Sequence, residues 1–248
     1  MVTLVRASLV ATVLASLALT IAPTIARANP RIGLSWNQCD SVETVHPVVS
    51  ADRVAHLFVF IEGLVGEVTG FEVEIQIRST GGNACTCYYE HWGVPPAWNF
   101  EPGGCQGPDR LNAEFRPPGS GCPTLANQPS FASQTAVVYP GYCSYMTCPT
   151  SYEALSLQAG ATHPWSLATP IRTTLWRLDF DLSASCAFAP SGVTCCPDDS
   201  PLSLQATGGL AWLKDGSTVQ LDGSRVTYSS DAVPARSASW GQIKAIYR

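Results

Sequence analysis

Ten cysteines constrain what this chain can fold into more than any other feature of its 248 residues. They all follow residue 28, and the segment before them, residues 1–28, has an early cation at Arg6, a long apolar run and a small-x-small ending at Ala26–Ala28. Those are the three parts of a secretory signal. An even cysteine count in an exported chain predicts a disulfide framework without a stoichiometric free thiol. We therefore expect the mature domain, residues 29–248, in a periplasmic or extracellular space, with ten half-cystines: Cys39, Cys85, Cys87, Cys105, Cys122, Cys143, Cys148, Cys186, Cys195 and Cys196.

The spacing of the cysteines does not determine their pairing. Short loops favour three bridges: Cys143 with Cys148, Cys105 with Cys122, and Cys186 with either Cys195 or Cys196. Cys85 and Cys87 stand one residue apart in the stretch "NACTCYYEHWG", where they could also hold a metal or supply a nucleophile beside His91. The sequence has no second paired-cysteine motif at zinc spacing, and an oxidised partner is available to every thiol. We therefore assign both cysteines to separate bridges and expect neither a metal site nor a cofactor.

Three stretches have the patterns of β-strands. Val54–Leu64 is an apolar, aromatic and β-branched run. The stretch "FEVEIQIR" alternates strictly and so predicts two faces: Phe71, Val73, Ile75 and Ile77 toward a core, and Glu72, Glu74, Gln76 and Arg78 in water. Thr173–Leu182 also alternates, in a register that the sequence does not fix; the residues expected near the core are Leu175, Leu178 or its neighbours, Phe180 and Leu182.

Turn signals complete the fold prediction. The pairs Asp215-Gly216 and Asp222-Gly223 predict tight hairpin turns in a meander of short strands. We expect a last strand at Ser239–Tyr247, and Thr150–Leu157 is the best candidate for a short helical turn. The pentapeptide "LSLQA", at residues 155–159 and again at 202–206, indicates two similar strands rather than a repeat, because the flanks differ. Together these patterns predict an all-β domain: a single antiparallel β-sandwich with long disulfide-pinned loops.

Two resemblances accompany these patterns. The stretches "RIGLSWNQCD", "PAWNFEPGGCQG" and "SWGQIKAIYR" resemble a group of exported bacterial proteins of unknown function that share a Trp-x-x-Cys start and a Gly-Gly-Cys-Gln segment. This likeness implies no activity. The order of "LFVFIEGL", "GFEVEIQI", "LWRLDFDL" and "LAWLKDG" is also similar to the strand order of cohesin-type sandwich modules. The second likeness implies the same β-sandwich fold.

The sequence lacks the common catalytic motifs. It contains no His-Glu-x-x-His, no Gly-x-Ser-x-Gly and no phosphate-binding glycine loop. Glu90 and His91 could act as acid and base with Glu101 if the fold brought the three together. We assign no catalytic residue, and we keep a secreted hydrolase that uses these loop carboxylates as the alternative function.

The charge balance excludes two classes of partner. There are 19 acidic against 14 basic residues, a formal net charge of −5, and removal of the signal takes away two more cations, Arg6 and Arg27. Nucleic acids and anionic membranes need clustered Lys and Arg, so neither is expected as a partner. Pro23 interrupts the apolar run of the signal, and we expect no membrane span in the mature chain. Calcium could bind Asp179 and Asp181 with Asp198 or Asp199, but without calcium-loop spacing we prefer a solvated strand face.

Aromatic residues give the leading functional hypothesis. Tyr88, Tyr89, Trp92 and Trp98 cluster in one loop region, and Tyr139, Tyr142 and Tyr145 in another. Exposed rings could stack on sugars, whereas buried rings would cover disulfides and cap the ends of the sandwich. We predict an exported, non-catalytic binding or structural module whose partner is a glycan or an extracellular protein, with the first cluster as its binding surface. The oligomeric state is not predicted.

Overall fold

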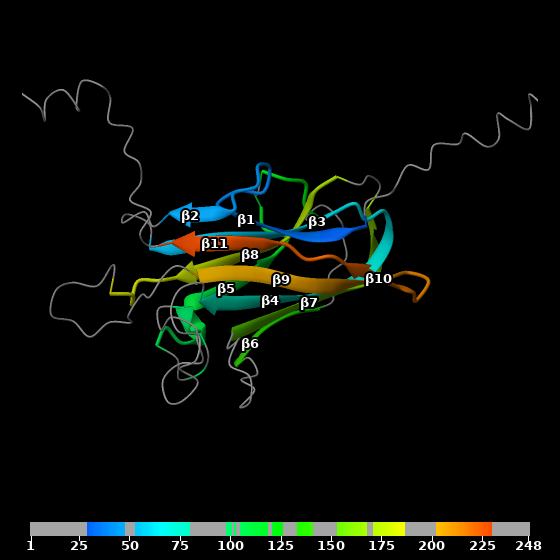
Figure 1. Ribbon diagram of the computed structural model, residues 1–248. Helices are drawn as coiled ribbons and strands as arrows, with labels where there is room; N and C mark the ends of the chain where they lie inside the picture. Colours follow the sequence, from blue (N-terminus) through cyan, green and yellow to red (C-terminus); the bar gives the residue numbers. More distant parts are fainter. Residues whose placement is uncertain are drawn as a thin grey trace, which may run out of the picture.

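The computed structural model describes residues 29–47, 53–79, 98–100, 102, 105–118, 121–125, 133–140, 153–167, 171–186 and 202–229. These residues form strands and one short 3-10 helix, Pro108–Arg110, and include no α-helix. The predicted signal segment, the loop from Thr80 to Ala97 and the expected last strand at Ser239–Tyr247 lie outside them. The predicted all-β class is confirmed (Figure 1).

The strands form two sheets that pack face to face as a β-sandwich, and all pairs but β2 with β11 are antiparallel. The smaller sheet has the order β1-β3-β8-β5, and the larger has the order β2-β11-β9-β4-β7-β6, with β10 also paired to β9. The bounds are β1 Arg31–Trp36, β2 Val45–Pro47, β3 Val54–Glu62, β4 Gly66–Ser79, β5 Leu111–Phe115, β6 Ser133–Pro140, β7 Glu153–Leu167, β8 Thr173–Asp181, β9 Leu202–Leu213, β10 Thr218–Leu221 and β11 Arg225–Ser229.

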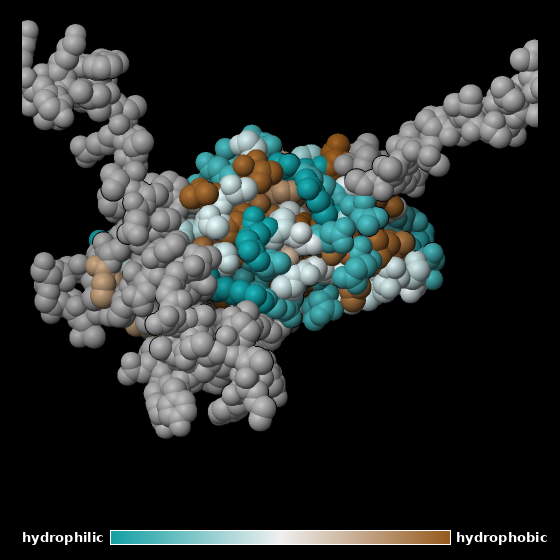
Figure 2. Space-filling view, in the orientation of Figure 1, coloured by the Kyte–Doolittle hydropathy of each residue, from teal (hydrophilic) through white to brown (hydrophobic). Residues whose placement is uncertain are grey.

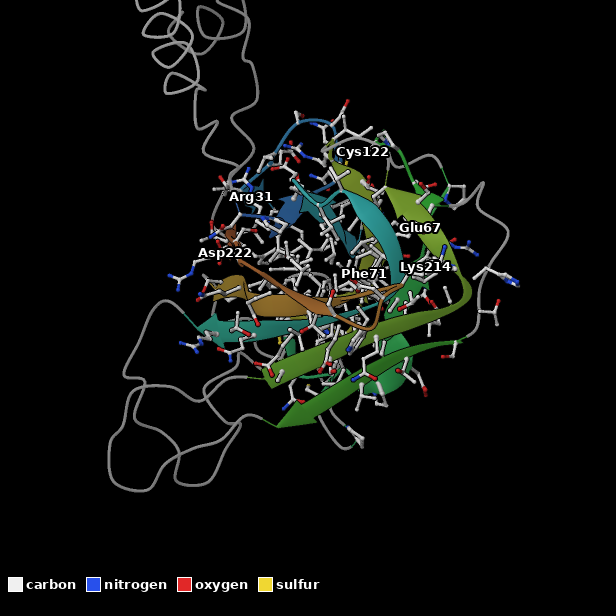
Figure 3. All side chains as sticks on the ribbon, turned by 90° about the vertical axis from the view of Figure 1, so that its right-hand side faces the viewer. Arg31, Glu67, Phe71, Cys122, Lys214 and Asp222 are labelled. Atoms are coloured by element: carbon white, nitrogen blue, oxygen red, sulfur yellow. A yellow bond between two sulfur atoms is a disulfide. The ribbon has the colours of Figure 1, made fainter. Side chains whose placement is uncertain are left out.

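Strand β4 confirms the alternation predicted from "FEVEIQIR". The four apolar residues of this stretch are buried against the smaller sheet: Phe71, Val73, Ile75 and Ile77. Figure 3 shows Phe71 between the two layers. Gln76 differs from the prediction because it is also buried, on the outer face, where it donates to Glu74 and accepts from Arg78.

Strand β7 corrects one sequence prediction. The segment proposed as a helical turn, Thr150–Leu157, falls largely within this strand, which pairs with β4 on one side and β6 on the other. Both "LSLQA" segments are strands, as predicted, and they flank β4: Ile75 has Leu155 as its partner on β7 and Ala206 on β9. Tertiary pairing with β4 therefore decides the conformation of a stretch whose local pattern is ambiguous.

A register shift settles which side chains of β8 face the core. Val59 of β3 pairs with Trp176, but Phe60 pairs with Thr174, so Leu175 is the extra residue. Such a bulge lets neighbouring residues face the same side. Leu175 and Leu178, which stand at positions of opposite parity, are consequently both fully buried.

The two Asp-Gly pairs have different roles. Gly216 has φ 84° in the turn between β9 and β10, so the hairpin predicted at Asp215-Gly216 is confirmed. The hairpin predicted at Asp222-Gly223 is wrong, because β10 and β11 both pair with β9 and continue in the same direction. The chain runs on along the same edge of β9 there, and a Cβ on Gly223 would come 1.8 Å from the carbonyl oxygen of Ala206.

The core contains two aromatic groups. One group has Trp98 at its centre, with ring centroids of Trp36, Phe100, Phe180 and Tyr228 between 4.5 and 6.3 Å away. The other joins Phe71, Phe115, Trp165 and Trp176 through contacts of 5.0 to 5.8 Å. Rings that meet edge-on or tilted at these distances fill the interior and attract one another.

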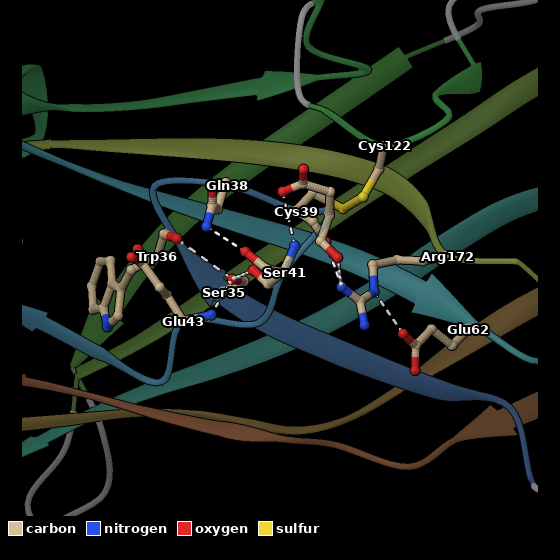
Figure 4. The surroundings of a disulfide bond; sticks show 10 residues. Ser35, Trp36, Gln38, Cys39, Ser41, Glu43, Glu62, Cys122 and Arg172 are labelled. Carbon is tan, nitrogen blue, oxygen red and sulfur yellow. Dashed lines mark hydrogen bonds and ion pairs between the residues drawn. A yellow bond between two sulfur atoms is a disulfide. The ribbon is translucent and has the colours of Figure 1, made fainter.

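The disulfide that the structure describes joins Cys39 to Cys122, with Cα atoms 5.5 Å apart (Figure 4). The predicted Cys105–Cys122 bridge is therefore wrong; Cys105 and Cys186 are also disulfide-bonded, and no cysteine in the described ranges is free. The short-loop argument failed because closure entropy rises only slowly with loop length, so folded geometry decides the pairing. The other predicted bridges involve cysteines outside the described residues.

The Cys39–Cys122 bridge covers the outer face of the smaller sheet. It packs on Phe58 and Phe60, which point away from the main core. The guanidinium of Arg172 lies 4.4 Å from the centre of the Phe60 ring and donates to the carbonyl oxygen of Cys39.

Candidate functional site

A depression of about 250 Å³ lies on the outer face of the larger sheet. Strands β4, β6, β7 and β9 supply its lining: Thr69, Gly70, Ser133, Thr135, Gln158, Ala159, Gly160 and Trp212. No charged residue is among them. The part of the described surface drawn in Figure 2 mixes small hydrophobic patches with hydrophilic residues.

Strand register builds this depression from one row of residues. Trp212 on β9 pairs with Gly70 on β4, Gly70 pairs with Gly160 on β7, and Gly160 pairs with Ser133 on β6. A row of paired positions shares one face of a sheet. Two neighbouring glycines in such a row leave a gap in the side-chain layer, bounded by the indole at one end and the Ser133 hydroxyl at the other.

Because Gly70 has no side chain, the ring of Trp212 can lie directly over it. A Cβ at position 70 would lie 2.7 Å from Cε3 of Trp212, so any larger residue would displace the ring. The register of β4 shifts between Val68 and Gly70, and the extra residue, Thr69, donates its hydroxyl to the carbonyl oxygen of Trp212 at 3.2 Å. The half-buried indole therefore rests on the sheet backbone and presents its remaining surface to the depression.

The polar lining is neutral. Ser133, Thr135 and Gln158 bring hydroxyl and amide groups that can donate and accept hydrogen bonds. The nearest ion pair, between Lys214 Nζ and Glu67 Oε2 at 2.8 Å, lies where β4 and β9 meet beyond Trp212 (Figure 3). A flat aromatic surface beside neutral hydrogen-bonding groups is suited to a polar ligand with an apolar face, as a sugar ring has.

The carboxylates with shifted pKa values lie elsewhere. Burial alone would raise the pKa of Asp179, but hydrogen bonds from His56 at 2.7 Å and Arg177 at 2.9 Å, with their charges, outweigh it and lower the pKa. Asp181 pairs with Arg110 at 3.1 Å and accepts from the backbone N–H of Ser183. Both carboxylates thus have partners within the protein, and Asp198 and Asp199, the other predicted calcium ligands, lie outside the described ranges.

Sequence reasoning placed one binding residue wrongly. Trp98 is fully buried at the centre of the larger aromatic group, so its ring is part of the core and is not presented to a ligand. Tyr88, Tyr89 and Trp92 lie outside the described residues, as do the proposed acid and base groups Glu90, His91 and Glu101. The described chain therefore gives no support to the alternative of a hydrolase.

Sequence reasoning also missed Trp212. The run Leu210–Leu213 is apolar at every position, so the sequence pattern alone does not fix which of its side chains face outward. The pairing of Trp212 with Gly70 and Gly160 was not accessible, because it depends on which strands are neighbours and in what register.

Two further searches of the structure give limited results. Within the described ranges, no group of three or more His, Cys, Asp or Glu side chains is arranged to hold a metal ion. Across the same residues, no helix has the length and apolar character needed to cross a membrane.

Comparisons with known proteins give a distant likeness. No family model and no curated protein matches the chain. A cohesin module from a family 33 glycoside hydrolase of Clostridium perfringens ATCC13124 aligns over 82% of this chain and 96% of its own, at 13% identity and a TM-score of 0.34. A non-cellulosomal cohesin from Archaeoglobus fulgidus aligns over 82% and 91%, at 9% identity and a TM-score of 0.35. At this similarity the likeness identifies no family and assigns no residue a role, and the comparisons do not show the group with the Trp-x-x-Cys start.

Proposed function

We propose that this protein is an exported, non-catalytic binding module that holds a carbohydrate in the depression beside Trp212. The observation that carries the proposal is the indole seated on Gly70 next to the neutral side chains of Ser133, Thr135 and Gln158. An aromatic face contributes dispersion and burial to a sugar ring, while hydroxyl and amide groups pair with its hydroxyls.

The character of the depression favours a sugar over other ligands. An anion would find no cation in the lining, and a metal would find no carboxylate. A catalytic site would bring an acid and a base together, but Asp179 and Glu62, the partly buried carboxylates with lowered pKa values, belong to ion pairs on the smaller sheet. The secretory signal predicted at residues 1–28 and the disulfides support a location where extracellular polysaccharides are available.

The test is a pair of matched variants, Trp212→Ala and Leu210→Ala. Both residues are half-buried and occupy consecutive outward-facing positions of β9. Only Trp212 lines the depression. Pull-downs on insoluble cellulose, chitin and xylan would be compared with melting curves of the same preparations. We expect Trp212→Ala to lose retention that Leu210→Ala keeps, with similar small decreases in melting temperature.

Two results would contradict this proposal. Retention of Trp212→Ala at the wild-type level would move the binding site elsewhere, and Trp92→Ala in the same assay would then test the cluster of Tyr88, Tyr89 and Trp92, which stays a prediction. Absence of wild-type retention on all three polysaccharides and on a glycan array would reject carbohydrate binding altogether.

A further inference from the structure

Strand β6 forms one edge of the larger sheet, and in the described chain it pairs with β7 alone. An edge strand presents backbone N–H and C=O groups that can pair with another strand. Proteins usually blunt such an edge with charged residues, proline, short length or a covering segment. The four edges of this sandwich differ in whether they have these features.

Three of the edges are blunted. Along β1, the backbone N–H of Ile32 donates to the carbonyl oxygen of Asp222 at 2.6 Å, and that of Leu34 donates to Ser224 Oγ at 2.8 Å, so this edge is occupied. Strand β2 has three residues and ends at Pro47. Strand β5 has five residues, and one of them is the charged Glu114.

Within the described part of the chain, strand β6 has none of these protections along most of its length. Its sequence, "SQTAVVYP", has eight residues, no charge, and a proline only at the last position. Residues 133–137 are exposed, and Val137 retains 52% of its surface. Gln134 points toward the other sheet, where its Oε1 accepts from the backbone N–H of Phe115 at 3.2 Å, so Ser133, Thr135 and Val137 share the outer face.

We propose that β6 pairs with β6 of a second copy of this chain, antiparallel and about a two-fold axis. Antiparallel pairing of identical strands is self-complementary and closes at two subunits. The chain has a formal net charge of −5, yet no charge lies on β6 to repel the second copy across the seam. Threonine and valine on the outer face also favour cross-strand packing.

The symmetry has a geometric consequence for ligand binding. A two-fold axis that reverses strand direction within one continuous sheet stands perpendicular to that sheet, so the outer faces of both copies point the same way. Ser133 and Thr135 line the depression and lie on β6 itself, so the two depressions adjoin the seam. Seven strand intervals of about 4.8 Å place the two Trp212 residues about 34 Å apart in the direction across the strands. A polymer that spans both sites would gain avidity, a benefit that rests on the proposed function, whereas the pairing itself does not.

Sedimentation of the oxidised protein without ligand tests the pairing. We expect a reversible monomer–dimer equilibrium between about 5 and 500 µM. Val137→Lys should weaken it at least about tenfold, because like charges then meet across the seam. The matched control is Thr207→Lys, which adds the same charge at an exposed position on β9, three strands away, and should associate as the wild type does.

Hydrogen exchange provides a readout that needs no variant. Amides of β6 should become more protected as the protein concentration rises, while amides of β10 should not change. If Val137→Lys melts well below the wild type, Thr135→Lys replaces it. A wild type that stays monomeric throughout would overturn the proposal. So would a dimer that persists in both β6 variants, Val137→Lys and Thr135→Lys. Either result leaves the sugar-binding test at Trp212 unaffected.

Discussion

Ile75 lies in the middle of β4, fully buried, with Leu155 and Ala206 as its partners on the two neighbouring strands. Ile75→Ala should lower the free energy of unfolding by about 2–4 kcal/mol, because it removes buried methyl groups and leaves a cavity. Glu72→Ala, on the solvent side of the same strand, should change it by about 0.5 kcal/mol or less. Urea unfolding of both variants measures the difference, and equal losses would mean that the face assignment is wrong.

Trp98 and Trp212, the two tryptophans considered as binding residues, differ in the residues that surround their rings. Trp98 is enclosed by four aromatic rings from strands and segments distant in sequence, whereas Trp212 faces two glycines. Composition suggested a binding surface where aromatics are dense in sequence. Trp98 itself instead fills the core, and the outward indole on β9 was overlooked because its neighbours are set by pairing.

Ion pairs between elements should make the smaller sheet sensitive to acid. Burial alone would raise the pKa of Glu62, but hydrogen bonds from Arg172 and Arg31 and their charges lower it, and Asp179 behaves alike between β3 and β8. A carboxyl whose pKa falls on folding stabilises the protein fully above its unfolded pKa, about 4, and loses that contribution as the pH drops through the folded value.

The corresponding measurement is the melting temperature of the wild type and of Asp179→Asn from about pH 7 to about pH 2. Asp179→Asn should melt below the wild type near neutral pH, and the gap should close in acid as the wild-type carboxylate takes up a proton. A gap that stays constant over this range would show that the ion pairs with His56 and Arg177 do not stabilise the fold.

Elements were predictable where local pattern and tertiary pairing agree. Alternation identified β4 and β8, and an apolar run identified β3. The amino-terminal half of β7 was misassigned because its strand character comes from pairing with β4 and β6. Asp222-Gly223 was taken for a hairpin because the dipeptide specifies a local bend and carries no information on which strand comes next.

The Cys39–Cys122 bridge acts on the whole molecule, because it closes a sequence separation of 83 residues. Replacing both cysteines by serine should lower the free energy of unfolding by about 2–4 kcal/mol, since the unfolded chain gains conformations and the cover of Phe58 and Phe60 is loosened. Urea unfolding under oxidising conditions measures this loss. An unchanged midpoint would mean that the remaining disulfides already restrict the same part of the chain.

The attachment of residues 30–36 to residues 222–227 determines how the sandwich would respond to mechanical load. Four hydrogen bonds join the two segments: Ile32 N–H to Asp222, Asp222 N–H to Pro30, Leu34 N–H to Ser224, and the Trp36 indole to Thr227. The two segments run in the same direction, since Arg31 lies beside Asp222 in a parallel bridge. A pull on residue 31 and residue 229 in opposite directions would shear all four bonds at once instead of opening them one at a time. The first and last described strands are thereby joined in the geometry that resists stretching best.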